Sequence, residues 1–133
     1  MISLSQEQVV QSKIEGYLIN LALTYEEAGE DVWVINDDDK GLGNVFVFAE
    51  DSLVTIRTKV MDVPAERKCE LFEELLRLNV DLVYGAYALD GADVILVETF
   101  ETGTLDYEEF QGALDAIGLS LAQHYPTLSV FRQ

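Results

Sequence analysis

Residues 32–60, which read VWVINDDDKGLGNVFVFAEDSLVTIRTKV, decide the fold of this chain. Three runs in this stretch are rich in β-branched and aromatic residues, which favour the pleated, half-buried surface of a sheet. The segments between the runs, Asn36–Gly41 and Glu50-Asp51, are short and polar, as hairpin turns are. The stretch therefore predicts three consecutive antiparallel strands. They comprise residues 32–35, 45–48 and 53–60.

The alternation of side chains assigns the residues of these strands to two faces, because successive strand residues point to opposite sides of a sheet. We take Glu50-Asp51 as a two-residue turn between the second and third strands. Val47 then pairs with Val54 on one face. Val45 and Ile56 form the next pair on the same face. This set is wholly apolar, and we assign it to the helices.

The opposite face is mixed, since it combines two aromatic rings with two cations. Aromatic residues and arginine supply much of the binding energy in protein interfaces, so this composition favours a partner-binding surface. The alternative is that the two phenylalanines are core residues, covered by the second helix or by a dimer mate. The candidate partner-binding residues are Phe46, Phe48, Leu53, Arg57 and Lys59.

Three helices and a second hairpin complete the chain. Apolar residues recur at helical spacing in 6–21, 64–79 and 106–125, and Pro126 is expected to end the last helix. Asp90-Gly91 separates two further β-rich runs and predicts a type I′ hairpin turn. The order α-β-β-β-α-β-β-α predicts one α+β domain over residues 1–133. Its architecture would be a five-stranded antiparallel sheet flanked by three helices.

The charge balance limits the partners of this domain. The sequence has 25 Asp and Glu against 8 Lys and Arg, a net charge of −17. Such a surface repels phosphate backbones and anionic lipids, so we expect no nucleic acid and no membrane as partner. Cys69 is the single cysteine, and the amino-terminal residues have neither a basic segment nor a long apolar run. We therefore expect a cytoplasmic protein.

Residues for catalysis or metal binding are scarce. His124 is the single histidine and lies near a helix end, which the helix dipole favours without any function. Cys69 is expected to be a packing residue. The acidic run Asp37–Asp39 fails the spacing of a calcium loop, because Lys40 and Val47 fall on ligand positions. We expect no enzyme activity, no metal and no cofactor.

Four segments in the second half of the chain carry a pattern that is characteristic when taken together. They are Phe72–Asn79, Tyr84–Asp90, Val94–Val97 and Thr104–Phe110. The pattern resembles the YbjN-like family, whose members are described as bacterial sensory transduction regulators. That family shares its fold with the type III secretion chaperones of the Tir-chaperone kind. The resemblance covers about residues 14 to 127. It implies a twisted antiparallel sheet flanked by three helices, a dimer, and no catalytic residues.

A homodimer is expected through the second helix, which has more apolar surface than one buried face of a short helix requires. The resemblance implies the same, because in that family this helix and its neighbouring strand form the two-fold contact. The candidate interface residues are Leu71, Phe72, Leu75, Leu76 and Leu78.

These observations predict a non-catalytic protein-binding domain, chaperone-like or regulatory, that binds a segment of a client or partner protein. The alternative is a small-molecule sensor or regulatory domain with a pocket between helix and sheet. The sequence does not identify the client.

Overall fold

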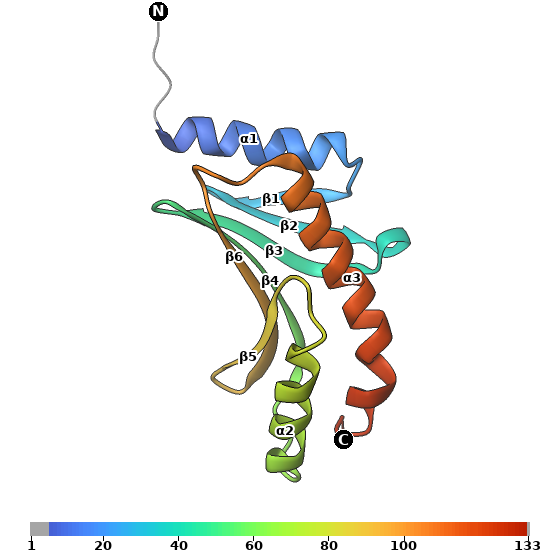
Figure 1. The fold of residues 1–133 in the computed structure, drawn as a ribbon. Helices are drawn as coiled ribbons and strands as arrows, with labels where there is room; N and C mark the ends of the chain where they lie inside the picture. Colours follow the sequence, from blue (N-terminus) through green and yellow to red (C-terminus); the bar gives the residue numbers. More distant parts are fainter. Residues whose placement is uncertain (1–5, 133) are drawn as a thin grey trace, which may run out of the picture.

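A computed structural model describes residues 6–132 as one antiparallel sheet of six strands with three α-helices (Figure 1). The elements in chain order are α1 (Gln6–Asn20), β1 (Tyr25–Gly29), β2 (Val32–Asp37), the 3₁₀ helix η1 (Asp38–Lys40), β3 (Leu42–Glu50), β4 (Leu53–Asp62), α2 (Lys68–Asn79), β5 (Ala86–Asp90), β6 (Asp93–Glu101) and α3 (Tyr107–Ser129).

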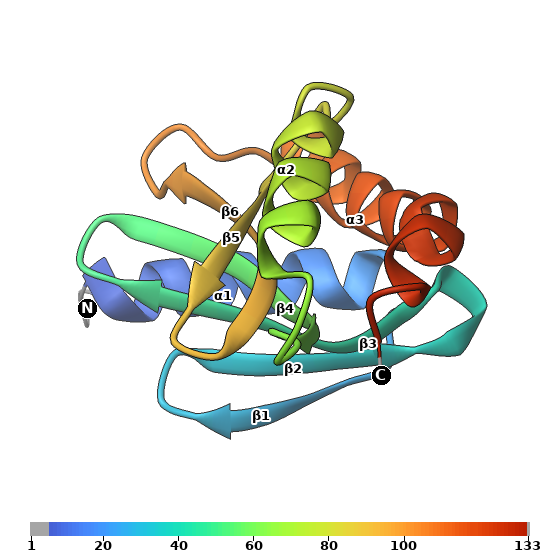
Figure 2. The same cartoon turned by 90° about the horizontal axis from the view of Figure 1, so that it is seen from below.

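The strands lie in the order β1-β2-β3-β4-β6-β5, and every neighbouring pair is antiparallel. Figure 1 shows α1 along the top of the sheet and α3 passing in front of it on the right, with α2 near β5 at its lower end. Figure 2, which views the molecule from below, shows how strongly the sheet curves between β1 and β5. Side chains from all three helices join one core cluster with the strands. The helices therefore pack on a single face of the sheet.

The α+β class and the three helices agree with the sequence prediction, but the sheet has six strands and not five. The additional strand is β1, which pairs with β2 at the edge of the sheet. Its sequence, YEEAG, has no apolar alternation, and only Tyr25 is partly buried. Backbone pairing with β2 therefore forms this strand, while its glutamates protect a sheet edge from pairing with another chain.

Both hairpin turns lie one residue later than the sequence predicted. The loop between β3 and β4 is Asp51-Ser52, closed by the pair of Glu50 with Leu53. The loop between β5 and β6 is Gly91-Ala92. In each loop the first residue has a positive φ, 55° at Asp51 and 58° at Gly91, and the second does not. The expected type I′ turn, which needs two positive values, is therefore wrong.

The shifted turn changes the strand register but leaves the two faces as predicted. Val47 pairs with Ile56 and not with Val54. The register moves by two residues, and because side chains alternate with a period of two, each residue keeps its face. All four residues assigned to the helix-covered face are fully buried, which confirms that assignment. They are Val45, Val47, Val54 and Ile56.

Neither proline lies where the sequence predicted a helix boundary. Pro64 is in the loop before α2, which begins only at Lys68 after a left-handed residue, Arg67. Pro126 lies inside α3, which continues to Ser129. The continuation is explained by packing, because the last turn brings the buried Leu128 to the core.

Helix α3 is fixed at its start and near its middle. The predicted capping box is present, since Glu109 N donates to Asp106 Oδ1 at 2.8 Å and Asp106 N donates to Glu109 Oε1 at 3.2 Å. Further along, Gly118 packs directly on η1. A Cβ atom at this position would lie 2.6 Å from the carbonyl oxygen of Lys40. The close approach of α3 to η1 therefore requires glycine at position 118.

Candidate functional site

The second face of the sheet is the candidate functional site, because the helices in residues 6–132 pack on the other one. Strand register places Phe46 beside Val34 on β2 and Arg57 on β4, and the row continues through Val97 to Ala86. A second row runs next to it, through Phe48 and Thr55. We call this surface the open face, formed by Val32, Val34, Phe46, Phe48, Leu53, Thr55, Arg57, Lys59, Ala86, Val97 and Thr99.

The apolar residues of the open face are accessible to solvent. Phe46 is 40% exposed and Leu53 is 43% exposed, while Phe48 is partly buried. No part of the chain between residues 6 and 132 covers Phe46 as a core residue is covered. The open face thus presents a ring and aliphatic side chains on a rigid sheet, which is an arrangement found in interaction surfaces.

Carboxylates fix the two cations of the open face in place. Arg57 Nη2 lies 2.7 Å from Asp90 Oδ2, and Lys59 Nζ lies 2.6 Å from Asp62 Oδ1 and 3.2 Å from Asp93 Oδ1. Hydrogen bonds to these carboxylates raise the pKa of Lys59. Exposed ion pairs of this kind stabilise a fold little, so their main effect is to orient the cations beside the phenylalanines.

The five residues predicted for a dimer interface on α2 divide into two groups. Leu71 and Leu75 are buried in the chain's own core, which departs from their predicted place in an interface with a second chain. Phe72 and Leu78 are partly buried, and Leu76 is 70% exposed. One helical stripe of α2 therefore packs inward beside β5, and a second stripe faces outward.

Sequence reasoning missed the continuation of this outward stripe. Val80 and Val83, directly after α2, are strongly exposed, and Leu89 on β5 is half exposed. With Leu76 on α2, they are the exposed large apolar residues of this part of the chain. The sequence does contain apolar residues directly after Asn79. Their exposure could not be predicted, because it depends on the direction in which the loop leaves the helix.

His124 and Cys69 have structural surroundings. The ring nitrogen Nδ1 of His124 lies 2.7 Å from the hydroxyl of Tyr87, whose pKa burial raises to about 12. Asn79 binds the backbone of the same tyrosine, since its Oδ1 accepts from Tyr87 N at 2.6 Å and its Nδ2 donates to Tyr87 O. Cys69 is exposed on α2 and is not the packing residue that the sequence predicted.

The acidic turn has a structural part as well. Asp37 Oδ2 accepts from the backbone of Thr24, and Asp38 and Asp39 begin η1. Within residues 6–132, no group of three or more His, Cys, Asp and Glu side chains could bind a metal ion. None of the helices in this range is long and apolar enough to cross a bilayer.

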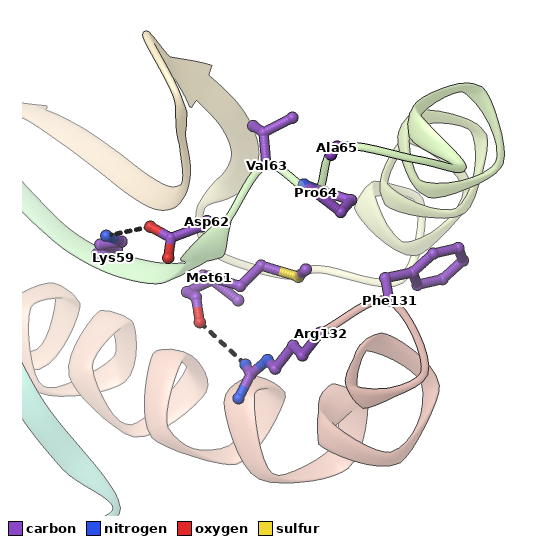
Figure 3. A pocket seen from close by; sticks show the side chains of 9 residues that line it. Lys59, Met61, Asp62, Val63, Pro64, Ala65, Phe131 and Arg132 are labelled. Carbon is purple, nitrogen blue, oxygen red and sulfur yellow. Dashed lines mark hydrogen bonds and ion pairs between the residues drawn. The ribbon is translucent and has the colours of Figure 1, made fainter.

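A pocket of about 430 Å³ lies at the end of β4, between the loop that leads to α2 and the residues after α3 (Figure 3). Met61 and Phe131 contribute apolar side chains to its wall, and Lys59 and Arg132 contribute cations. Lys59 is also a residue of the open face, so the two surfaces adjoin.

Comparison with known proteins gives a family and a fold. The model of the CesT_Tir_1 family matches residues 7–133. A search of the curated proteins found no match to this sequence.

Solved structures with the same fold were found at low sequence identity. YbjN from E. coli is 10% identical, with a TM-score of 0.65 over 88% of this chain and 92% of that one. A chain of the HopA1–SchA chaperone–effector complex is 6% identical, with a TM-score of 0.67 over 91% and 97%. A chain of the heterodimeric ExoU–SpcU complex from the type III secretion system of Pseudomonas aeruginosa is 14% identical, with a TM-score of 0.69 over 85% and 95%. These similarities confirm the predicted fold.

Proposed function

Because this chain belongs to the CesT_Tir_1 family, we propose that it is a non-catalytic protein-binding domain that holds a segment of a client or partner protein on the open face. Its role is that of a chaperone or a regulator. The observation that carries this proposal is the exposure of Phe46 and Leu53 on a sheet face next to oriented cations.

The energetics of the open face support protein binding. A phenylalanine that is 40% exposed, as Phe46 is, gains less from folding than a fully buried ring would. In an interface the same ring supplies a large contact area at low entropic cost. The ion pair of Arg57 with Asp90 leaves further N–H groups of the guanidinium for a partner. A segment bound here would bury the rings of Phe46 and Phe48 and receive hydrogen bonds at the rim.

The solved structures of this fold support the same proposal. Two of the matched chains come from complexes of two proteins, one of them a chaperone with an effector. A fold that supports such complexes at 6% and 14% identity has a surface suited to a protein partner. The choice of partner then depends on side chains that differ between members.

The exposed part of α2 supports a homodimer as the working form. Leu76, Val80 and Val83 are exposed, and Phe72 and Leu78 lie at the border of this surface. A two-fold contact through this surface would bring the same apolar residues of two copies together. A stable dimer of this kind buries at least about 1,000 Å² in total.

The charge of the chain supports the remaining part of the proposal. A net charge of −17 opposes binding to nucleic acid and to anionic lipid surfaces, and it maintains solubility while the apolar residues of the open face are unoccupied. We place the protein in the cytoplasm and assign it no cofactor and no catalytic residue.

The proposal is tested by affinity capture from a bacterial lysate with three immobilised proteins: the wild type, Phe46→Ser and Leu119→Ser. Leu119 is the matched control, because it is 60% exposed on the outer side of α3 and lies outside the open face. Mass spectrometry should identify proteins that the wild type and the Leu119 variant bind and the Phe46 variant does not. Equal capture by all three proteins would exclude the open face as the binding site.

The dimer is tested by light scattering on Leu76→Glu and the control Leu119→Glu. Both changes place a charge on an exposed leucine, so neither should unfold the chain. The wild type and the control should have twice the mass of one chain, and Leu76→Glu should have the mass of a monomer. A monomeric wild type at micromolar concentration would contradict the dimer.

The alternative function, a small-molecule sensor, is favoured by one observation, the pocket at the end of β4. Its volume of about 430 Å³ is within the range of roughly 300–1,000 Å³ that ligand pockets have. A thermal-shift screen against small metabolites addresses this alternative. A ligand that raises the melting temperature through this pocket, without any effect of Phe46→Ser, would favour the sensor.

A further inference from the structure

The pocket at the end of β4 joins segments that are far apart in the sequence, and we call it the tail pocket. Residues 59–65 form one side and residues 131–132 the other. Arg132 connects the two sides, because its Nη2 donates to the backbone oxygen of Val60 at 2.9 Å (Figure 3). The hydrogen bond fixes the guanidinium at the rim of a preformed hollow.

The inner surface of the tail pocket is mainly apolar. Six of its lining residues lack a polar or charged side-chain group that could form a strong hydrogen bond, and they are Val60, Met61, Val63, Pro64, Ala65 and Phe131. Pro64 also has no backbone N–H. This surface suits an aliphatic or aromatic side chain of a ligand, whose burial would be favoured by the hydrophobic effect.

The cation at the rim differs from the other arginines of the chain. Arg57, Arg67 and Arg77 each form an ion pair with an aspartate or glutamate. Among the residues that the structure describes, no carboxylate lies within ion-pair distance of Arg132. Its guanidinium lies 5.0 Å from the ring centroid of Tyr125 and makes one hydrogen bond to Val60. A guanidinium has five N–H donors, so most of them are available to a ligand.

A second arginine packs against the wall of the tail pocket, although its charge is paired with Glu70. Arg67 lies over the ring of Phe131, with its guanidinium carbon 4.7 Å from the centroid. Asp62 also lines the pocket, but its carboxylate is paired with Lys59. An apolar hollow with the guanidinium of Arg132 at its rim is complementary to an anion that carries an apolar group. Arginine matches the planar geometry of a carboxylate particularly well.

We propose that the tail pocket receives an apolar side chain of the bound protein segment, and that Arg132 binds an Asp or Glu carboxylate next to that side chain. Lys59 belongs both to the open face and to the tail pocket, so the two surfaces adjoin at this residue and one segment would occupy both. This inference rests on the proposed function and adds the chemistry of the partner: acidic and apolar residues side by side. The overall negative charge repels acidic segments that lack this match, which makes the contact selective.

The test is a titration of the ¹⁵N-labelled protein followed by NMR, with acetyl-Asp-Leu-amide and acetyl-Asn-Leu-amide as probes. The amides of residues 60–65 and 131–132 should shift with the aspartyl peptide, and the dissociation constant should be about tenfold larger for the asparaginyl peptide, as expected for loss of one charge-assisted hydrogen bond. Arg132→Gln should make the two peptides bind equally. Arg77→Gln, which removes an arginine of α2 that is paired with Glu73, should keep the difference.

Three results would overturn the inference: no shift at the tail pocket, equal shifts with both peptides in the wild type, or shifts confined to the open face. A further arm uses hexanoate, a free carboxylate with an apolar chain. Stronger binding of hexanoate than of the aspartyl peptide at the same amides would make the pocket a small-molecule site and contradict segment binding. Capture that depends on Phe46 tests the open face separately, so failure at the tail pocket leaves the proposed function in place.

Discussion

The two faces of this sheet are built from alternate residues of the same strands, yet their composition is the reverse of what burial alone would select. The covered face of β3 has the smaller residues Val45 and Val47, which are fully buried. The open face of the same strand has Phe46 and Phe48, and Phe46 is 40% exposed. The largest apolar side chains of this strand are thus not used to fill the core. The difference shows that stability and binding are separated by the two-residue period of one strand.

The largest difference between the two faces is expected at two neighbouring residues of β4. Ile56→Ala removes a fully buried side chain and should lower the free energy of unfolding by ~2–5 kcal/mol, measured by urea denaturation. Thr55→Ala, on the open face, should change it by less than about 0.5 kcal/mol. Similar losses for both variants would mean that the open face is covered in solution.

The next effect tests how closely the covered face is packed. Gly118→Ala adds a Cβ that would lie 2.6 Å from the backbone oxygen of Lys40, so helix and turn must separate. We expect a loss of ~1–3 kcal/mol, as for other overpacked sites, although alanine favours helices. Gly16→Ala on α1, where nothing lies within 4 Å of the added Cβ, is the control and should not destabilise the protein. If the Gly118→Ala variant were as stable as the wild type, α3 would lie farther from the backbone of Lys40 than the structure shows.

A smaller effect on stability is expected on the open face itself. Phe48→Ala should cost clearly less than the ~3–5 kcal/mol of a buried phenylalanine, because its ring is only partly covered. Capture of the client should nevertheless decrease. Phe110→Ala on α3, which removes a fully buried ring, provides the reference for a core position in the same denaturation experiment. A Phe48 variant that unfolds like the Phe110 variant would assign Phe48 to the core.

The smallest effect concerns the rim of the covered face, where Glu15 of α1 lies near Glu27 of β1. The Glu15 carboxylate accepts a hydrogen bond from protonated Glu27, and this bond together with the negative charge of Glu15 raises the pKa of Glu27 above its usual 4.5. A raised pKa in the folded state means that protonated Glu27 stabilises the fold below about pH 4.5, and this contribution is lost as the pH rises through the raised value.

Glu27→Gln should therefore raise the melting temperature more at pH 7 than at pH 4. Glu26→Gln, at the neighbouring glutamate of β1, is the control for removing one negative charge from this strand. Equal effects of the two substitutions at both pH values would mean that Glu15 does not raise the pKa of Glu27.

Much of this architecture follows from local sequence patterns. The strands of residues 32–60, the capping box of Asp106 and the order of the helices each depend on residues close in sequence. Strand β1 could not be predicted, because its pairing with β2 and not its composition makes it a strand. Likewise, α2 has two apolar stripes, and the sequence cannot indicate that Leu71 packs inward while Leu76 faces outward.

The open face could be predicted from the sequence, but the tail pocket could not. Alternation placed Phe46 and Phe48 opposite the valines, and the two-residue error in register did not change this. The tail pocket could not be predicted, since it depends on residues 131–132 returning to the end of β4. Contacts of that kind are set by the length and direction of α3, which continues through a proline that was expected to end it.

The hydrogen bonds of Tyr87 have a consequence for how the molecule opens. Its backbone is bound by Asn79 of α2 and its hydroxyl lies 2.7 Å from His124 of α3, so β5 cannot separate from the sheet without losing contacts to both helices. Helix α2, strand β5 and the second half of α3 should thus exchange their amide hydrogens as one cooperative unit, while the edge strand β1 exchanges independently and earlier. The outward stripe of α2 would then be either fully folded or fully unfolded, without a partly folded intermediate.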